Sequence, residues 1–140
     1  MDLKNKLKNF PHIYYFNLDN RQDRRKYMED QFLYWKLDFT RVSGSQFLAS
    51  NLNEWGRKYI HGNIEKIPAY CLGNTITHLE FLKKWYQTND NEYVLLMEDD
   101  YDLNLLEYWN FDWDYLMNRI PYDWDCLQLG FESKEFIPFF

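Results

Sequence analysis

The feature that most limits which folds this sequence can adopt is a short apolar run followed directly by acidic residues. The run spans Tyr93 to Met97, and it is followed by Glu98, Asp99, Asp100 and, two residues later, Asp102. This pattern predicts a buried strand that reaches the edge of its sheet, and in an open α/β sheet ligands bind where strands end. Adjacent carboxylates repel one another, so a cation among them would offset that cost. Oxygen ligands favour a divalent ion such as Mn²⁺ or Mg²⁺, whereas a solvated acidic turn is the alternative interpretation.

The remaining sequence alternates between expected strands and expected helices. Strands are expected at 12–17, 37–42, 93–97 and 125–129. Helices are expected at 21–36, from Gly73 or Thr77 to 86, and at 104–120, with a short one near 55–60 in the weakly patterned stretch 44–68. This order predicts a single α/β domain over 1–140, with a mainly parallel sheet and helices on both of its faces.

Two of these helices are expected from the spacing of their apolar residues. Met28, Phe32 and Trp35 share one face of the helix 21–36. The helix 104–120 is expected to be continuous until Pro121, because apolar residues recur at helical spacing at 106, 109, 113, 116 and 120. Both helices should therefore bury one stripe against the sheet.

Composition and charge exclude several classes of protein. The net charge of −6 argues against a general nucleic-acid binder, and two cysteines cannot define a disulfide framework. The N-terminal residues are too polar for a signal peptide, and no apolar run approaches the roughly 20 residues of a membrane span. We therefore expect a cytoplasmic protein. The Asn-, Lys-, Tyr- and Phe-rich composition is compatible with an AT-rich bacterial or viral genome, and a viral protein would act in the host cytoplasm.

A second polar cluster follows the first expected strand. Asn17, Asp19, Arg21 and Arg24 lie at the strand end and in the first turn of the next helix. Free backbone N–H groups beside guanidinium groups make such a turn a candidate anion or nucleotide site. The alternative is an N-capped helix with surface ion pairs to Asp23. The turn lacks the glycine-rich phosphate fingerprints, so neither a dinucleotide fold nor a P-loop is supported.

Three segments in order resemble glycosyltransferase family 25, which includes bacterial lipooligosaccharide and collagen galactosyltransferases. They are IYYFNLDNRQDRR (13–25), IPAYCLGNTITHLEFLKKW (67–85) and YVLLMEDDYDL (93–103), and DWDCLQLG (123–130) resembles a later strand of the family. The second match is inexact, because the order is Cys-Leu-Gly and Thr77 takes the place of a Ser before His78. The resemblance implies a GT-A-type (Rossmann-like) fold, a UDP-galactose or UDP-glucose donor, and Mn²⁺ or Mg²⁺.

The resemblance also implies roles for single residues. Glu98 and Asp100 resemble the Asp-x-Asp-type metal motif, and Asp99 would face the other way, towards the ribose or a helix N-terminus. The nucleotide would be held by Asn17, Asp19, Arg21 and Arg24, with His78 supporting the acidic loop.

The chain ends soon after the last expected strand, whereas family members are usually longer. Transfer with inversion needs a general base, and Glu132 is the candidate, which makes Glu132 and Asp99 the expected catalytic residues. The acceptor would be a glycan or a hydroxylated protein, and the chain would be a shortened member of the family or a fragment. The alternatives are a non-catalytic carbohydrate- or nucleotide-sugar-binding module, or an assembly domain that forms homo-oligomers through the aromatic end 136–140.

Overall fold

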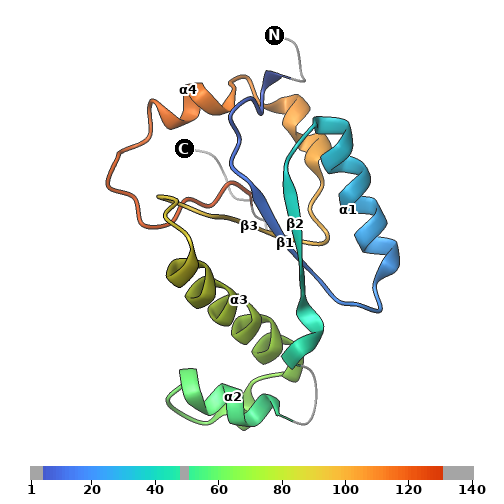
Figure 1. Cartoon of the computed structure of the whole chain (residues 1–140), viewed down its shortest axis with the longest axis vertical. Coiled ribbons are helices and arrows are strands. Elements are labelled where there is room, and N and C mark those ends of the chain that lie inside the picture. Colours follow the sequence, from blue (N-terminus) through green and yellow to red (C-terminus); the bar gives the residue numbers. More distant parts are fainter. Residues whose placement is uncertain (1–4, 48–50, 131–140) are drawn as a thin grey trace, which may run out of the picture.

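The computed structural model describes residues 5–47 and 51–130 and contains a small parallel sheet (Figure 1). Its described strands are β1 (Ile13–Asn17), β2 (Phe39–Ser43) and β3 (Leu95–Glu98), in the order β2-β1-β3. Both pairings of β1 are parallel. Asn17 pairs with Ser43, and Phe16 pairs with Glu98, so all three strands end at the same edge. The predicted α/β class and parallel sheet are confirmed, at the scale of three strands.

The helix α1 (Gln22–Trp35) covers one face of β1. Its predicted apolar stripe, formed by Met28, Phe32 and Trp35, is buried as expected. The stripe packs in one cluster with Ile13 and Tyr15, which are both fully shielded from solvent. Alternate residues of a strand point to the same face, so the alternation of β1 decides which residues meet α1.

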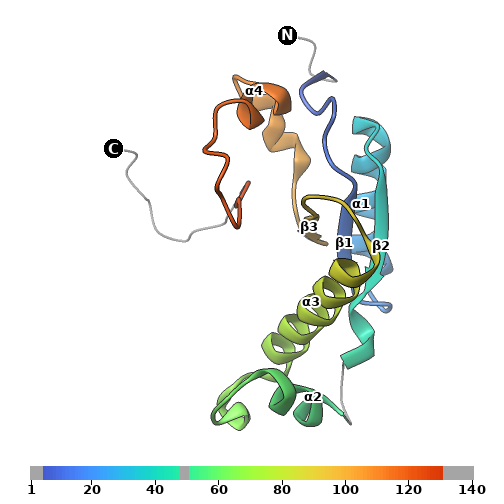
Figure 2. The same cartoon turned by 60° about the vertical axis from the view of Figure 1, so that its left-hand side comes forward.

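The helix α3 (Ala69–Thr88) covers the opposite face of β1. The ring of Phe81 lies 4.8 Å from that of Tyr14 and 5.5 Å from that of Phe16, measured between centroids. Helices therefore lie on both faces of the sheet, as predicted. The N-terminal end of α3 lies beside α2 (Leu52–Tyr59), and its C-terminal half lies on the sheet. α2 is at the end of the molecule away from α4 (Trp113–Met117) (Figures 1 and 2).

The predicted start of α3 was wrong, because the helix begins at Ala69 rather than at Gly73 or Thr77. Pro68 precedes it, and the Pro68 carbonyl accepts the N–H of Leu72 at 3.0 Å. The Thr77 hydroxyl donates to the Gly73 carbonyl within the helix and caps nothing. A proline at the helix start fits this arrangement because no N–H is required there.

The continuous helix predicted at 104–120 is broken into two pieces. They are the 3₁₀ helix η4 (Leu103–Tyr108) and α4. Asp102 accepts the N–H of Asn104, and Asp112 accepts the N–H of Tyr115, so each piece has its own cap. The buried ammonium of Lys6 donates to carbonyls at the end of η4 and beyond it, which stops the helix there. Two further described 3₁₀ turns are η2 (Gly44–Phe47) and η3 (Ile64–Lys66).

The fourth strand predicted at 125–129 is absent from the described residues. The segment keeps the expected alternation, with Leu127 and Leu129 partly buried and Gln128 exposed. It forms no ladder with β3, because alternation places side chains but supplies no pairing partner.

The described helices include none with the length and apolar character needed to cross a bilayer.

Candidate functional site

Asn17 is the hub of the polar cluster at the carboxyl edge of the sheet. It is the last residue of β1, and only 2% of its surface is exposed. Its amide donates to the Asp99 carboxylate at 2.7 Å and to the Arg21 carbonyl at 3.1 Å. Its side-chain oxygen Oδ1 accepts from Nε of Arg41 at 3.0 Å. Because both ends of the amide are engaged, its orientation is fixed, and it ties the end of β1 to the loop after β3.

Asp99 is the buried member of the acidic motif. It is 7% exposed, and besides Asn17 it accepts from Nη1 of Arg24 at 2.9 Å. Arg24 also donates to Asp100 at 3.2 Å, so one guanidinium joins two neighbouring carboxylates. A buried carboxylate is tolerated only when it is paired and hydrogen-bonded, and these contacts meet that condition. Asp99 thus points towards the start of α1.

Glu98 points to the other side, towards α3. Its Oε1 atom accepts from the Asn74 amide at 3.2 Å and lies 3.3 Å from Nε2 of His78. The His78 ring lies on Phe16 at 3.9 Å between centroids, and its Nδ1 faces the Asn74 carbonyl at 3.2 Å. If Nδ1 donates to that carbonyl, Nε2 can donate to Glu98 only when the ring is protonated. The structure therefore places His78 beside Glu98, and the supporting role that the resemblance implies for it stays a prediction.

Asp19 lies next to β2 rather than beside the acidic motif. It accepts hydrogen bonds from Arg41 and, at 2.9 Å, from the Ser43 hydroxyl. These two hydrogen bonds, that of Arg41 being the larger effect, lower the pKa of Asp19 below its usual value. Arg41 was missed by the sequence reasoning, although it stands near the end of the expected strand 37–42. Its position in that strand was the available signal.

Arg21 takes no direct part in the contacts of Asp99. It forms a two-bond surface pair with Asp23 at 2.7 and 3.0 Å, and this contact lowers the pKa of Asp23. The alternative interpretation of this turn, surface ion pairs on a capped helix, is thus correct for the ion pair. It is wrong for the cap, because no side chain of the described residues caps the start of α1.

The chemistry of the acidic motif fits a hard cation only in part. Glu98, Asp99 and Asp100 offer carboxylate oxygens, the ligand type that Mg²⁺ and Mn²⁺ prefer. Within 5–47 and 51–130, however, no three metal-binding side chains are grouped as a preformed site. Glu98 and Asp100, the predicted ligands, contact α3 and Arg24 respectively. Mg²⁺ is often held by one or two carboxylates together with phosphate oxygens of a substrate, and this mode is compatible with the observed groups.

Comparison with protein-family models finds no match, and comparison with curated proteins finds no significant one. The similarity to glycosyltransferase family 25 therefore stays a prediction that rests on the motifs. Glu132 and the aromatic end 136–140 lie outside the described residues.

Proposed function

We propose that the chain is a metal-dependent glycosyltransferase of the family 25 type, with a GT-A-type fold. It would transfer galactose or glucose from a UDP-sugar to a glycan or a hydroxylated protein. One observation carries the proposal: the three segments of the resemblance meet at one edge of the sheet. The contact of Asn17 with Asp99 joins the first segment to the third, at 2.7 Å, and that of His78 with Glu98 joins the second to the third, at 3.3 Å.

The metal would be held by Asp100 and Glu98, with donor phosphates completing its ligands. When bound, Mn²⁺ or Mg²⁺ supplies positive charge that offsets the charge developing on the UDP leaving group. Arg24 contacts Asp100 through an exposed hydrogen bond and Asp99 through a more buried one. Its link to Asp99 would hold the guanidinium in place at the first turn of α1, where a phosphate is favoured by free N–H groups.

The other residues would position these groups. Asn17 fixes the Asp99 carboxylate, and Arg41 fixes Asn17 from β2. His78 and Asn74 orient the Glu98 carboxylate from α3. Glu132 is retained in the proposal as the general base that would accept the proton of the acceptor hydroxyl.

A turnover assay tests the proposal. UDP release from UDP-galactose and UDP-glucose is measured with Mn²⁺ and with EDTA, in wild type, Asp100→Asn and Asp38→Asn. Asp38 is exposed and directly precedes β2, at the opposite edge of the sheet, so it is a matched control. We expect release that needs metal, is lost in Asp100→Asn and is unchanged in Asp38→Asn. Binding of UDP without any release would favour the non-catalytic binding module, and release unaffected by Asp100→Asn would refute the assigned site.

A further inference from the structure

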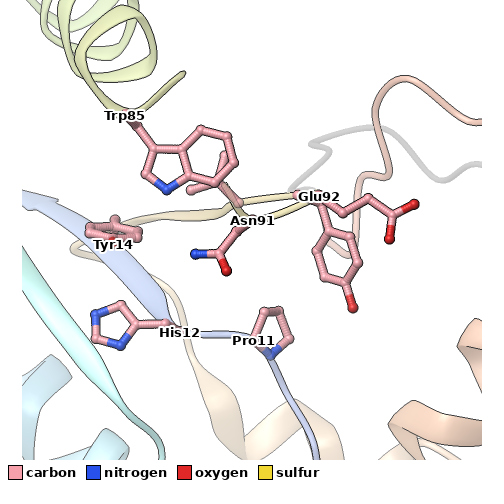
Figure 3. A pocket seen from close by; sticks show the side chains of 8 residues that line it. Pro11, His12, Tyr14, Trp85, Asn91 and Glu92 are labelled. Carbon is pink, nitrogen blue, oxygen red and sulfur yellow. The ribbon is translucent and has the colours of Figure 1, made fainter. Parts of the chain in front are cut away.

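A hollow of about 380 Å³ lies at the opposite edge of the sheet, where β1 and β3 begin (Figure 3). It is lined mainly by rings and polar side chains from three parts of the chain. They are His12 and Tyr14 at the start of β1, Trp85 near the end of α3, and Asn91, Glu92 and Tyr93 before β3. Its volume falls within the roughly 300–1,000 Å³ of small-molecule sites.

Trp85 gives this hollow an unused hydrogen-bond donor. Its Nε1 atom is shielded from solvent and has no partner among the described residues. In Figure 3 the nitrogen edge of the indole faces the side of the hollow where Tyr14 and Asn91 lie. Trp35 carries the other such indole, but it lies in the apolar cluster beneath α1. A buried donor without a partner is unfavourable, so a small turn of the indole that brings Nε1 to a ligand acceptor in the hollow would be stabilising.

The charges around the hollow narrow the class of ligand. None of the described lining residues is Lys or Arg, and Glu92 is acidic, so a phosphate or carboxylate would be disfavoured. A purely apolar ligand would leave the polar groups of Asn91, Glu92 and Trp85 without partners. The rings of Tyr14, Trp85 and Tyr93 favour a ligand with a flat apolar face.

We propose that this hollow binds a neutral hexopyranoside. The C–H face of a pyranose would pack on the aromatic rings, and its hydroxyl groups would accept from Trp85 and exchange hydrogen bonds with Asn91 and Glu92. Asn91 is exposed, and its amide nitrogen donates a hydrogen bond to Oδ1 of Asn89 at 3.2 Å. The inference stands on the residues of the hollow alone, and it does not require the chain to transfer sugars.

The hollow is separate from the carboxyl edge described above. The rings of Tyr14, Phe81 and Phe16 form a row along the α3 face of β1, and His78 follows Phe16 at the acidic end. A sugar at one edge and a nucleotide at the other would therefore contact different residues. Under the proposed function, the hollow would hold a neutral sugar unit of the acceptor at a distance from the reacting bond.

Indole N–H signals in a ¹H–¹⁵N correlation spectrum test this proposal. The chain has six tryptophans, and the signal lost in Trp85→Phe identifies Trp85. Methyl β-D-galactopyranoside and methyl β-D-glucopyranoside are the probes. We expect one of them to shift the Trp85 signal saturably, with smaller shifts at the other indoles. Asn91→Ala, an exposed substitution that should leave the fold intact, should weaken binding by roughly fivefold, as expected for one lost hydrogen bond.

Two comparisons keep this test distinct from that of the proposed function. Asp100→Asn should leave the glycoside titration unchanged, because Asp100 lies at the other edge of the sheet. Inorganic phosphate should not move the Trp85 signal. The proposal is overturned if neither glycoside gives a saturable shift, if Asn91→Ala binds as tightly as wild type, or if phosphate competes for the hollow. None of these results depends on whether UDP is bound or released.

Discussion

The two faces of β1 differ in what they contribute. On the α1 face, Ile13, Tyr15 and Phe32 belong to one continuous cluster and are fully shielded from solvent. On the α3 face, Phe16 is buried, but Tyr14 and Phe81 are only partly buried, and the fully buried residues of α3 pack instead against α2. Both candidate binding regions touch the α3 face, one at each end. The difference indicates that the α1 face forms the closed core of the fold, whereas the α3 face is more open to solvent.

The largest expected effect comes from removing one ring on each face. Phe32→Ala should lower the free energy of unfolding by about 3–5 kcal/mol, because it leaves a cavity in a closed cluster. Phe81→Ala should cost about 1–2 kcal/mol, because Phe81 is partly exposed and its neighbours can relax. Urea unfolding of both variants measures the difference. Equal losses would show that the two faces contribute alike and would break the comparison.

Lys6 should give the next largest effect. It is 5% exposed, and its ammonium donates to the carbonyls of Leu106, Glu107 and Trp109 at 2.5–3.1 Å. Lys6→Met should cost roughly 2–3 kcal/mol, because one buried and two partly buried carbonyl hydrogen bonds lose their charged donor. The exposed Lys8 is the control, and Lys8→Met should change stability by less than about 0.5 kcal/mol. If Lys6→Met left the free energy of unfolding unchanged, the segment after β3 would be held by other contacts.

Asn17, the last residue of β1, should contribute more to stability than His12, which directly precedes β1. Asn17→Leu should lower the free energy of unfolding by about 1–3 kcal/mol, because Asp99 and Arg41 each lose a partner. His12 is the comparison: it is exposed and forms a hydrogen bond with the Thr40 hydroxyl at 2.8 Å. His12→Ala should change the free energy of unfolding little. Chemical denaturation of both variants provides the test. If His12→Ala costs as much, the hub assigned to Asn17 is incorrect.

Tyr15 should give the smallest effect, and one that depends on pH. Burial raises the pKa of Tyr15 above its usual value, and its hydrogen bond to Glu29 at 2.7 Å raises it further. Because the folded pKa is raised, the resulting stability is complete below the ordinary tyrosine pKa of about 10 and is lost as pH rises above it. Urea unfolding of wild type and Tyr15→Phe should therefore converge at alkaline pH. A constant difference up to strongly alkaline pH would contradict the assignment.

Patterns that depend on local spacing were predicted well from the sequence. The strand 12–17 and the buried stripe of Met28, Phe32 and Trp35 follow from alternation and helical period, so they need no knowledge of distant residues. The break between η4 and α4 depends on Lys6, which lies about a hundred residues away in the chain. No periodicity within 104–120 could have revealed that contact.

In the candidate site, too, the local clusters were predictable from the sequence and the contacts between distant residues were not. The acidic motif and the turn after β1 were recognisable as clusters in the sequence, and His78 was placed beside the motif by resemblance. Arg41 required the register of β1 on β2, and the separate directions of Glu98 and Asp100 required the positions of α3 and α1. The aromatic hollow joins residues within 11–14 to residues within 85–94, which are far apart in the chain, and had no sequence signal.

The most direct test of the central claim is calorimetric titration of UDP into the protein. It should be carried out with Mn²⁺ and with EDTA, on wild type, Asp100→Asn and Asp38→Asn. We expect saturable binding that requires Mn²⁺, is lost in Asp100→Asn and is retained in Asp38→Asn. Absence of binding to wild type with Mn²⁺, or equal binding by Asp100→Asn, would contradict the assignment of a nucleotide-sugar site to the carboxyl edge of the sheet.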